Sequence, residues 1–593
     1  MAAFRLTDDE LIAKIEETTV EATRHQLDTL RKILDRNAAV GYLRRAAGTV
    51  DVDNFRRIVP LSTYDDYADH INKIADGLDD YGDGDGDSGS RFLSFDPLVC
   101  FFLRFSVSSS LCPFFRFFGN YGFWEAPSKS ASYLAHMGSA ALLRRQFPPR
   151  ATIDKSLWFL YAGNIKTTKG GFKEMAASSL PLSGIKESQS PFLSTCIAPA
   201  QVAMGSNLQH QMYCHLLCGL RRFDLIDSIR APYAISLIRA FSMLKTKWDQ
   251  LCDDLDSGVL RSEVTDIAMR DAVTEFLDGP NPDMADRVRS ICQEESWDGI
   301  IAKLWPNVRY VKCTATGIMQ QYYKKLKHYA GDIPLIGGDY FASECCVGIN
   351  LDIMQPPKKT RFVILPTAAY FEFLPFDLED DSSTSDRETV DISGVQVGNM
   401  YEVVVTTFRG LYRYRLGDVV KVVGFHNSSP EIEFVMRAPK SATEFVTERD
   451  LMRAVWNLEL ELEGALSMGQ ITEFASFMDL HENGTKQLTI YIEFGEGSMI
   501  LEKGKEGKAV AFLRSCGSSI EDGLGVLYKS RRETGEIGQS RLSVVNVGSF
   551  DLLLQVAIEN GAPASQYKSP KIIRNQKMAD FLEASSALTV SFG

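Results

Sequence analysis

The stretch Gly410-Leu-Tyr-Arg-Tyr-Arg-Leu-Gly-Asp418, followed by Val419-Val-Lys-Val-Val-Gly-Phe425, decides the fold of this chain. It places aromatic rings, two guanidinium groups and a carboxylate in a glycine-bounded turn, and then enters a β-branched run typical of a buried strand. A carboxylate at the start of such a strand can accept both hydroxyls of a ribose. The two arginines suit a phosphate, because the guanidinium fork pairs with phosphate oxygens. Spacing alone leaves open the alternative of a hairpin with solvated charges.

Two further blocks lie far from this stretch. His328-Tyr-Ala-Gly-Asp-Ile-Pro-Leu335 is followed by Asp339-Tyr-Phe-Ala-Ser-Glu344, and Gln566-Tyr-Lys-Ser-Pro570 lies near the carboxyl end. Together with the opening stretch they resemble the motifs of the plant Gretchen Hagen three family, whose HYAGDLPL, Tyr-x-x-Ser-Glu and C-terminal lysine motifs occur in this order. The family consists of acyl-acid amido synthetases of the adenylate-forming superfamily. The resemblance covers nearly the whole chain, to about Arg574.

Length and composition agree with a globular protein of two domains. The 593 residues exceed what one core usually supports, which is about 250–300 residues. The strand-like runs 158–162, 309–313, 361–365 and 402–406 alternate with helical stretches, which predicts an α/β fold with much parallel pairing. After Arg437-Ala-Pro-Lys440 the pattern restarts as a compact α+β unit. We therefore expect a large domain over residues 1–436 and a smaller one over 441–593.

The resemblance makes this architecture more specific. It implies a large N-terminal adenylate-forming domain of the firefly-luciferase type, which binds ATP and the acyl acid, and a small mobile C-terminal domain. At the amino end, Thr7 and Glu10 form a capping box, and the apolar spacing from Leu11 to Leu34 predicts one long amphipathic helix. Farther along the chain, Asp83, Asp85 and Asp87 alternate as in a calcium loop. Ser88 and Ser94 replace the Gly and Glu of such a loop, which favours a solvated loop instead.

Charge and cysteine usage exclude several classes of protein. A net charge of -13 and a pI near 5.3 argue against a nucleic-acid surface, which needs a basic stripe. The eleven cysteines are scattered without zinc-type spacing, which fits reduced thiols in a cytosol. The amino end carries acids where a targeting peptide carries bases, and charges and prolines interrupt the most apolar stretch, 97–124. The sequence thus predicts a cytoplasmic protein with neither membrane nor nucleic-acid partners.

The resemblance implies roles for individual residues. Asp418 would hold the ribose of ATP, Phe425 would line the nucleotide wall, and Tyr340 would stack on adenine. Glu344 would be an oxygen ligand of Mg²⁺ bound with ATP, and Lys568 would bring positive charge to the anionic intermediate, so that Glu344 and Lys568 are the catalytic pair. The remaining residues implied in ATP binding are Phe341, Ala342 and Ser343, together with Ser108 and Ser109.

The phosphate loop departs from the family pattern. Adenylate-forming enzymes cradle phosphates with a turn rich in Ser, Thr and Gly, whose small residues let the backbone approach closely. The family text is close to S-S-G-T-S-G-G, whereas here the segment reads Ser106-Val-Ser-Ser-Ser-Leu-Cys-Pro113. Ser108 and Ser109 match, but Leu111 cannot donate a hydrogen bond. If this loop is genuine, ATP affinity should suffer.

The acyl-acid pocket is predicted from a second stretch. Thr168-Lys-Gly-Gly171 matches the family, but the continuation from Phe172 to Ser179 does not. Thr168, Phe172, Met175 and Thr316 are the candidate acid-binding residues, and ordinary core packing is an equally good interpretation of them. The substrate acid would be jasmonate-like or auxin-like; the text after Arg437 is closer to the jasmonate branch.

The predicted function is ATP-dependent amide ligation of a plant hormone acid to an amino acid through an acyl-adenylate. Two alternatives remain open. One is a catalytically impaired homologue that acts as a binding or regulatory protein. The other is an active enzyme whose written sequence is misassembled around 97–124, because family-like text lies on both sides of that segment. Sequence reading settles neither the acid, nor the amino acid, nor the oligomeric state.

Overall fold

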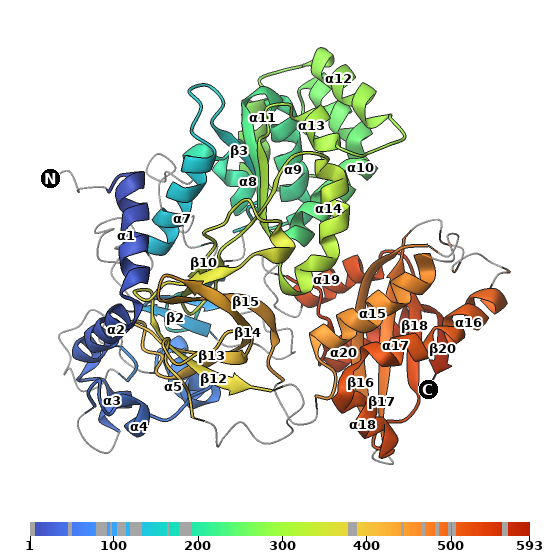
Figure 1. Ribbon diagram of the computed structural model, residues 1–593. Helices are drawn as coiled ribbons and strands as arrows, with labels where there is room; N and C mark the ends of the chain where they lie inside the picture. Colours follow the sequence, from blue (N-terminus) through green and yellow to red (C-terminus); the bar gives the residue numbers. More distant parts are fainter. Residues whose placement is uncertain are drawn as a thin grey trace.

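The structure is a computed structural model that describes most of the chain (Figure 1). The described residues are 6–45, 50–78, 92–94, 98–103, 114–118, 133–162, 165–176, 179, 193–377, 388–439, 444–463, 469–480, 485–495, 498, 500, 504, 506–559 and 567–592. The Asp83–Asp87 loop, the serines at 108 and 109 and Gln566 lie outside them. Among the described residues no helix is long and apolar enough to cross a membrane.

Short helices form the amino-terminal region: α1 (Asp8–Val20), α2 (Ala22–Asn37), α3 (Gly41–Arg44), α4 (Phe55–Ile58) and α5 (Asp65–Ala75). The predicted capping box is present, because the Thr7 hydroxyl accepts from the Glu10 amide at 3.2 Å and the Glu10 carboxylate accepts from the Thr7 amide at 2.7 Å. The prediction of one continuous helix was wrong, because the chain leaves helical geometry at Glu21 (φ -111°, ψ 42°).

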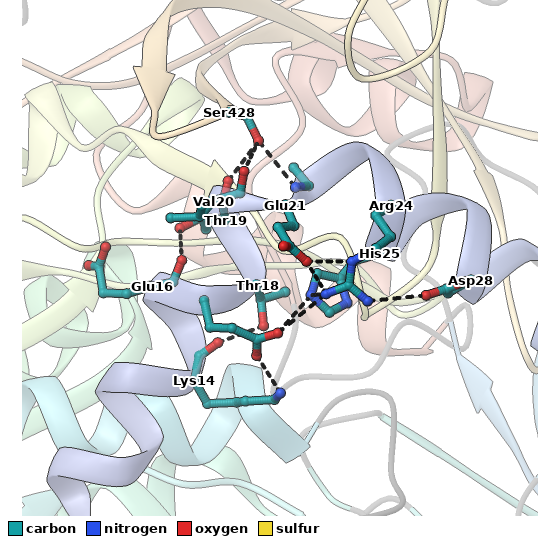
Figure 2. Close-up of polar contacts among 12 residues, drawn as sticks. Lys14, Glu16, Thr18, Thr19, Val20, Glu21, Arg24, His25, Asp28 and Ser428 are labelled. Atoms are coloured by element: carbon teal, nitrogen blue, oxygen red, sulfur yellow. Dashed lines mark hydrogen bonds and ion pairs between the residues drawn. The ribbon is translucent and has the colours of Figure 1, made fainter.

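The break between α1 and α2 is held by a residue far along the chain (Figure 2). The Ser428 hydroxyl donates to the carbonyls of Thr19 (2.9 Å) and Val20 (2.8 Å) and accepts from the Ala22 amide at 3.1 Å. It therefore satisfies groups that a helix end leaves without partners. The β-branched run Thr18-Thr19-Val20 also disfavours helix at this point. Helix spacing alone cannot reveal a cap supplied from residue 428.

One sheet is wholly parallel and matches the α/β prediction. Its strand order is β3-β6-β7-β8. The strands are β3 (Lys155–Trp158), β6 (Ile226–Tyr233), β7 (Tyr310–Thr314) and β8 (Leu335–Gly337). The helices around and between them are α7 (Tyr133–Gln146), α8 (Ala200–Met204), α9 (Leu208–Arg221), α10 (Ala234–Ser257), α11 (Ile267–Leu277), α12 (Pro282–Cys292), α13 (Ile300–Leu304) and α14 (Tyr323–Ala330), with 3-10 turns η4 (Leu193–Thr195), η5 (Phe223–Leu225) and η6 (Gly317–Tyr322). The large first core packs between this sheet and its helices.

The opening motif belongs to a different sheet, which has seven strands and only antiparallel pairs. Its order is β12-β13-β14-β15-β11-β10-β9. The strands are β9 (Tyr340–Phe341), β10 (Cys346–Ile349), β11 (Phe362–Ile364), β12 (Tyr370–Phe376), β13 (Met400–Thr406), β14 (Tyr414–His426) and β15 (Ser429–Arg437), with the 3-10 turn η7 (Pro357–Lys359) between β10 and β11. The expectation of much parallel pairing therefore holds for the first sheet and is wrong for this one.

A smaller mixed sheet packs with the seven-stranded sheet around a second hydrophobic core. It contains β1 (Leu98–Leu103), β2 (Phe114–Phe118), β4 (Lys166–Thr167) and β5 (Lys173–Ala176), in the order β2-β1-β5-β4. Phe101 and Met175 are buried there with side chains of the seven-stranded sheet. The predicted acid-binding stretch that begins at Thr168 therefore runs from the edge of this sheet into the second core.

The C-terminal region forms its own α+β unit (Figure 1). Its sheet has the order β19-β16-β17-β18-β20. The strands are β16 (Ile471–Leu480), β17 (Lys486–Phe494), β18 (Ser540–Val545), β19 (Ile572–Ile573) and β20 (Ser586–Phe592), and the helices are α15 (Glu448–Glu463), α16 (Glu506–Ser515), α17 (Gly517–Gly523), α18 (Gly525–Glu533), α19 (Ser549–Glu559) and α20 (Gln576–Ala584). Successive side chains of β17 point to opposite faces of the sheet, and each face has its own hydrophobic core. Ile490 is buried in one of these cores and Tyr491 in the other, so helices cover both faces of the sheet. The predicted restart of the pattern after 440 is confirmed.

Candidate nucleotide and acyl-acid site

Both arginines of the opening motif are paired inside the protein. The Arg413 side chain faces Glu372 with Nε 3.1 Å from both carboxylate oxygens, and it also donates to two backbone carbonyls at 2.6 and 2.8 Å. Arg415 donates to Glu402 from Nη2 at 2.6 Å. Both carboxylates are buried, at 0% and 2% exposure. Both arginines are therefore engaged in ion pairs with buried carboxylates, which favours a structural role over contact with a phosphate.

Asp418 lies inside β14, four residues after the strand begins at Tyr414, and both of its oxygens have partners. The Tyr340 hydroxyl donates to Oδ2 at 2.5 Å, and Nη1 of Arg437 lies 2.7 Å from Oδ1. Arg437 is the cross-strand neighbour of Asp418 between β14 and β15. Burial and the charge of Asp418 raise the pKa of Tyr340 well above its usual value. The Tyr340 hydroxyl therefore stays protonated and donates to Asp418.

The seven-stranded sheet curls enough to bring β9 to β14. Three strands separate them in the sheet order, yet the Tyr340 ring packs against Phe362 of β11 at 5.4 Å and against Phe434 of β15 at 6.0 Å before its hydroxyl reaches Asp418. Edge-to-face and tilted rings at such distances are a favourable arrangement. The curl thus unites two motifs that lie 78 residues apart in the sequence.

A second link joins the Tyr-x-x-Ser-Glu turn to the opening motif. Arg409, just before the motif, donates from Nη1 to the carbonyls of Ser343 (3.0 Å) and Glu344 (3.3 Å). Burial lowers the pKa of Arg409 to about 10, so it remains charged at neutral pH. The next residue, Gly410, has φ +91°, and a Cβ there would lie 2.3 Å from the Leu93 carbonyl oxygen. Arg409 thus links the two turns, while the close approach of the opening motif to Leu93 requires glycine at position 410.

Glu344, the predicted Mg²⁺ ligand, belongs to the turn that Arg409 contacts. Its side chain is 3% exposed, on the turn between β9 and β10. Mg²⁺ is usually bound by one or two carboxylates together with substrate phosphates. Glu344 thus fits a metal that arrives with a nucleotide. Another cluster, Glu17, Glu21 and His25, has ligand atoms within 4.8 Å of one another, but Lys14 and Arg24 already pair with its carboxylates (Figure 2).

Lys568 lies between the C-terminal unit and the parallel sheet. Its ammonium nitrogen is 4.2 Å from the centre of the Tyr233 ring, at the start of α10. The preceding residue, Tyr567, is buried and lies under the guanidinium of Arg239 at 5.5 Å. The lysine head packs on an aromatic face of the large region. Such cation–π contacts contribute about 0.5–1 kcal/mol at partly exposed sites.

The remaining nucleotide candidates are spread along the sheet. Phe341 is 41% exposed and stacks on His136 at 4.4 Å, and Ala342 closes the turn by donating its amide to the Cys345 carbonyl at 2.9 Å. Phe425 is seven residues beyond Asp418 on β14, which corresponds to roughly 20 Å of strand. It is 44% exposed. The structure does not bring Phe425 to the Asp418 carboxylate.

The four acid-pocket candidates fall into two places. Thr168 and Phe172 close a tight turn, in which the Thr168 amide donates to the Phe172 carbonyl at 2.9 Å and the Phe172 amide donates to the Thr168 hydroxyl at 3.2 Å. The Phe172 ring packs edge-on against Phe101 at 5.8 Å. Met175 is 1% exposed in the same core. Thr316 lies instead beyond the carboxyl end of β7, where it begins η6. In open α/β sheets ligands bind at the carboxyl ends of the strands, which favours Thr316 over the other three.

Sequence similarity supports the resemblance given above. The GH3 family N-terminal domain matches residues 11–103 and 125–335, its central domain matches 362–437 and its C-terminal domain matches 449–577. The interval 104–124, which contains the altered phosphate loop, is not covered. Probable indole-3-acetic acid-amido synthetase GH3.6 of Oryza sativa subsp. japonica is 48% identical over 398 residues, 66% of this chain and 80% of that protein.

Full-length relatives agree. Jasmonoyl–L-amino acid synthetase GH3.5 of the same organism is 33% identical over 97% of this chain and 96% of its own length. Among solved structures, GH3.15 acyl acid amido synthetase superposes with a TM-score of 0.84 at 28% identity, covering 99% of this chain and 98% of that chain. The fold and the linked motif turns define an acyl-acid amido synthetase of the adenylate-forming class, an acid–amino acid ligase. The chain belongs to the GH3 family.

Several residues at this site were not predicted from the sequence. Arg437 was interpreted only as part of the joint between domains, although it pairs with Asp418. Arg409 lies one residue before the quoted motif and was not considered. The sequence could have indicated Arg409, because the next residue is a glycine that requires positive φ. Such a turn fixes the direction in which the arginine side chain leaves the backbone.

Proposed function

We propose that the protein uses ATP and Mg²⁺ to conjugate a jasmonate-like or auxin-like carboxylic acid to an amino acid through an acyl-adenylate. One observation carries the proposal. Tyr340 and Glu344 of one family motif and Asp418 of another are held together by the Tyr340–Asp418 hydrogen bond of 2.5 Å and by Arg409. An enzyme that adenylates an acid needs such a rigid surface, because this chemistry depends mainly on positioning and charge stabilisation.

In this proposal Asp418 is the ribose ligand and the Arg437–Tyr340 pair sets its orientation. A ribose hydroxyl would take up the free lone pairs of the carboxylate, which has about four acceptor sites and uses only some of them for Arg437 and Tyr340. Glu344 would hold Mg²⁺, which supplies charge neutralisation at the phosphates when bound. Tyr340, Phe341, Ala342 and Ser343 form the surface facing the base. Phe425 is not part of the proposed nucleotide site, because it lies too far from Asp418 along β14.

The reaction has two half-steps. In the first, a carboxylate oxygen of the acid attacks the α-phosphorus, the bond to the bridging oxygen breaks, and pyrophosphate leaves. In the second, the amine attacks the acyl carbon, loses a proton and displaces AMP. Lys568, on the proposed small domain 441–593, would balance the negative charge at the phosphorus during the first step. The positive charge is already poised against the large domain 1–436 through Tyr233.

The nature of the acid is supported by relatives rather than by the pocket. The matching synthetases are named for indole-3-acetic acid and for jasmonate, and one solved relative contains 2,4-DB. All three molecules are carboxylic acids with an apolar body. Thr316, at the carboxyl end of β7, is the residue that we propose for the acid side, with Thr168, Phe172 and Met175 behind it in the second core.

The test is acid-dependent exchange of labelled pyrophosphate into ATP, run with jasmonic, indole-3-acetic and benzoic acids. Conjugates with each amino acid are then sought by mass spectrometry. Exchange with one acid, lost in Asp418→Ala, is the expected result. ATP binding by calorimetry with no exchange for any acid would instead favour the impaired homologue that acts by binding. Unchanged ATP affinity in Asp418→Ala would remove that residue from the site.

A further inference from the structure

A buried carboxylate joins the C-terminal unit to the large region. Glu473 of β16 accepts a hydrogen bond from the Tyr322 hydroxyl at 2.5 Å, and Nε2 of Gln321 lies 3.3 Å from its other oxygen. Tyr322 and Gln321 end η6, in the large region. Within the C-terminal unit the same carboxylate pairs with the Lys571 ammonium, whose side chain is 1% exposed. Glu473 is thus shared between two parts of the protein.

This cluster is too well buried to be an incidental surface contact. Tyr322 and Glu473 are 4% and 6% exposed, and Lys571 is 0% exposed. A charge removed from water is tolerated only when it is paired and hydrogen-bonded. Lys571 meets this requirement through Glu473 and through the Phe474 carbonyl at 3.1 Å. Burial and the charge of Glu473 raise the pKa of Tyr322 well above its usual value, so its hydroxyl stays a donor.

The cluster lies three residues from the proposed catalytic lysine. The Lys571 carbonyl accepts from the Ser476 amide at 2.7 Å, which attaches the segment 568–571 to β16. Pro570 and Ser569, between the two lysines, are buried. At the other end of the cluster, η6 directly follows Thr316, its N-cap and the residue proposed for the acid side. Glu473 is therefore in contact with the element that carries Lys568 and with the element that carries Thr316.

We propose that Glu473 and Tyr322 are positioning residues for the adenylation step. Glu473 fixes the segment that carries Lys568, and the Tyr322 hydroxyl holds this assembly against η6, so that Lys568 is placed on the large region only while the Tyr322–Glu473 bond exists. The Glu473–Lys571 pair belongs wholly to the C-terminal unit and remains when that unit turns away. The contacts of Glu473 with Tyr322 and Gln321 must break, and the Tyr322 bond is the shorter of the two. This inference rests on the proposed function.

The variant Tyr322→Phe tests the proposal by removing one oxygen atom and keeping the ring. The matched control is Tyr491→Phe, because the Tyr491 hydroxyl also donates to a glutamate, Glu583, at 3.2 Å, but inside the C-terminal unit. Hydrogen bonds to charged groups are strong enough for their loss to shift an equilibrium by about tenfold or more. In the free protein, amide hydrogen exchange of the peptides covering 316–323 and 567–573 should rise at least severalfold in Tyr322→Phe and stay unchanged in Tyr491→Phe.

Kinetics give the second readout. In Tyr322→Phe, kcat of the pyrophosphate exchange should fall about tenfold while KM for the acid stays within twofold, because the change affects the placement of Lys568 rather than binding of the acid. Aminolysis of chemically supplied acyl-adenylate should not slow. Lys571→Arg should retain activity that Lys571→Met loses, because the positive charge next to Glu473 is kept.

The two readouts separate the inference from the proposed function. A protein without exchange activity that still shows the difference in hydrogen exchange between Tyr322→Phe and Tyr491→Phe supports the contact as a link between the two parts, and places the failure in the proposed function. Equal hydrogen exchange in the two variants, with thermal unfolding showing both to be folded, overturns the positioning role. Equal kcat in Tyr322→Phe and the unmodified protein overturns it as well.

Discussion

Replacement of Arg413 by Met should destabilise the large region without affecting the nucleotide. The guanidinium faces both oxygens of Glu372 at 3.1 Å and donates to two carbonyls and to the Thr389 hydroxyl, and the side chains of the ion pair are 9% and 1% exposed. Removing one partner of such a pair leaves a buried charge and costs about 3–5 kcal/mol. For a unit of about 430 residues, unfolding entropy of roughly 0.9 kcal/mol per degree converts this cost to a fall in Tm of roughly 3–6 °C.

Differential scanning fluorimetry and ATP titration are the paired measurements for this variant. Arg361→Met is the matched control, because Arg361 is 53% exposed and pairs with Glu433 at 3.4 Å. Exposed pairs contribute about 0–1 kcal/mol, so its Tm should fall by no more than about 1 °C. The double change Glu372→Gln with Arg413→Met should recover part of the loss. If Arg413→Met kept its Tm but lost ATP affinity, the arginine would be a phosphate ligand after all and the structural interpretation would be refuted.

Three further results are expected. Lys568→Ala should change Tm by less than about 2 °C, since only one cation–π contact is lost, but should lower the rate of acyl-AMP formation; an unchanged rate in stopped-flow or exchange assays would make the lysine a bystander. The triple change Ser110→Gly, Leu111→Thr and Cys112→Ser should raise pyrophosphate exchange, because it restores the small residues and hydroxyls that cradle phosphates; full activity in the unmodified protein would contradict this. Burial lowers the pKa of His215 to about 4 from an ordinary value near 6.5, so the unfolded chain takes up this proton first and stability should fall by about 1.4 kcal/mol per pH unit as pH drops from about 6.5 toward 4. His215→Gln should remove that slope in urea unfolding at pH 7, 6 and 5, and parallel curves would show that His215 does not titrate in this way.

Periodicity predicted the local elements well where each element supplies its own signal. The strands expected at 309–313 and 402–406 are β7 and β13. The run after Asp418 lies in β14, where Val419, Val420 and Val422 are buried, as the β-branched run predicts. These predictions succeed because the spacing of apolar residues within one element decides its type.

Partner choice could not be predicted, because it depends on contacts between residues far apart in sequence. Arg413 selects Glu372, 41 residues away, and Tyr340 selects Asp418 across 78 residues. An arginine in a glycine-bounded turn looks the same in sequence whether it meets a phosphate or a buried carboxylate. The antiparallel sheet has the same cause, because the strands expected at 361–365 and 402–406 are β11 and β13 but their neighbours were not predicted. The strand expected at 158–162 was misplaced, because β3 ends at Trp158.

The serine that caps the break between α1 and α2 has a consequence for synthesis of the chain. Ser428 follows Thr19 by 409 residues, and ribosomes add about 5–20 residues per second. The partner of the break therefore appears roughly 20–80 s after the helices themselves. Gln26, which donates to the Pro366 carbonyl at 2.6 Å, must wait almost as long. Until then the apolar faces of both helices, with Leu11, Ile15 and Leu30, lack the surface they cover in the finished protein. The helices α1 and α2 are thus made long before the residues that hold them in position.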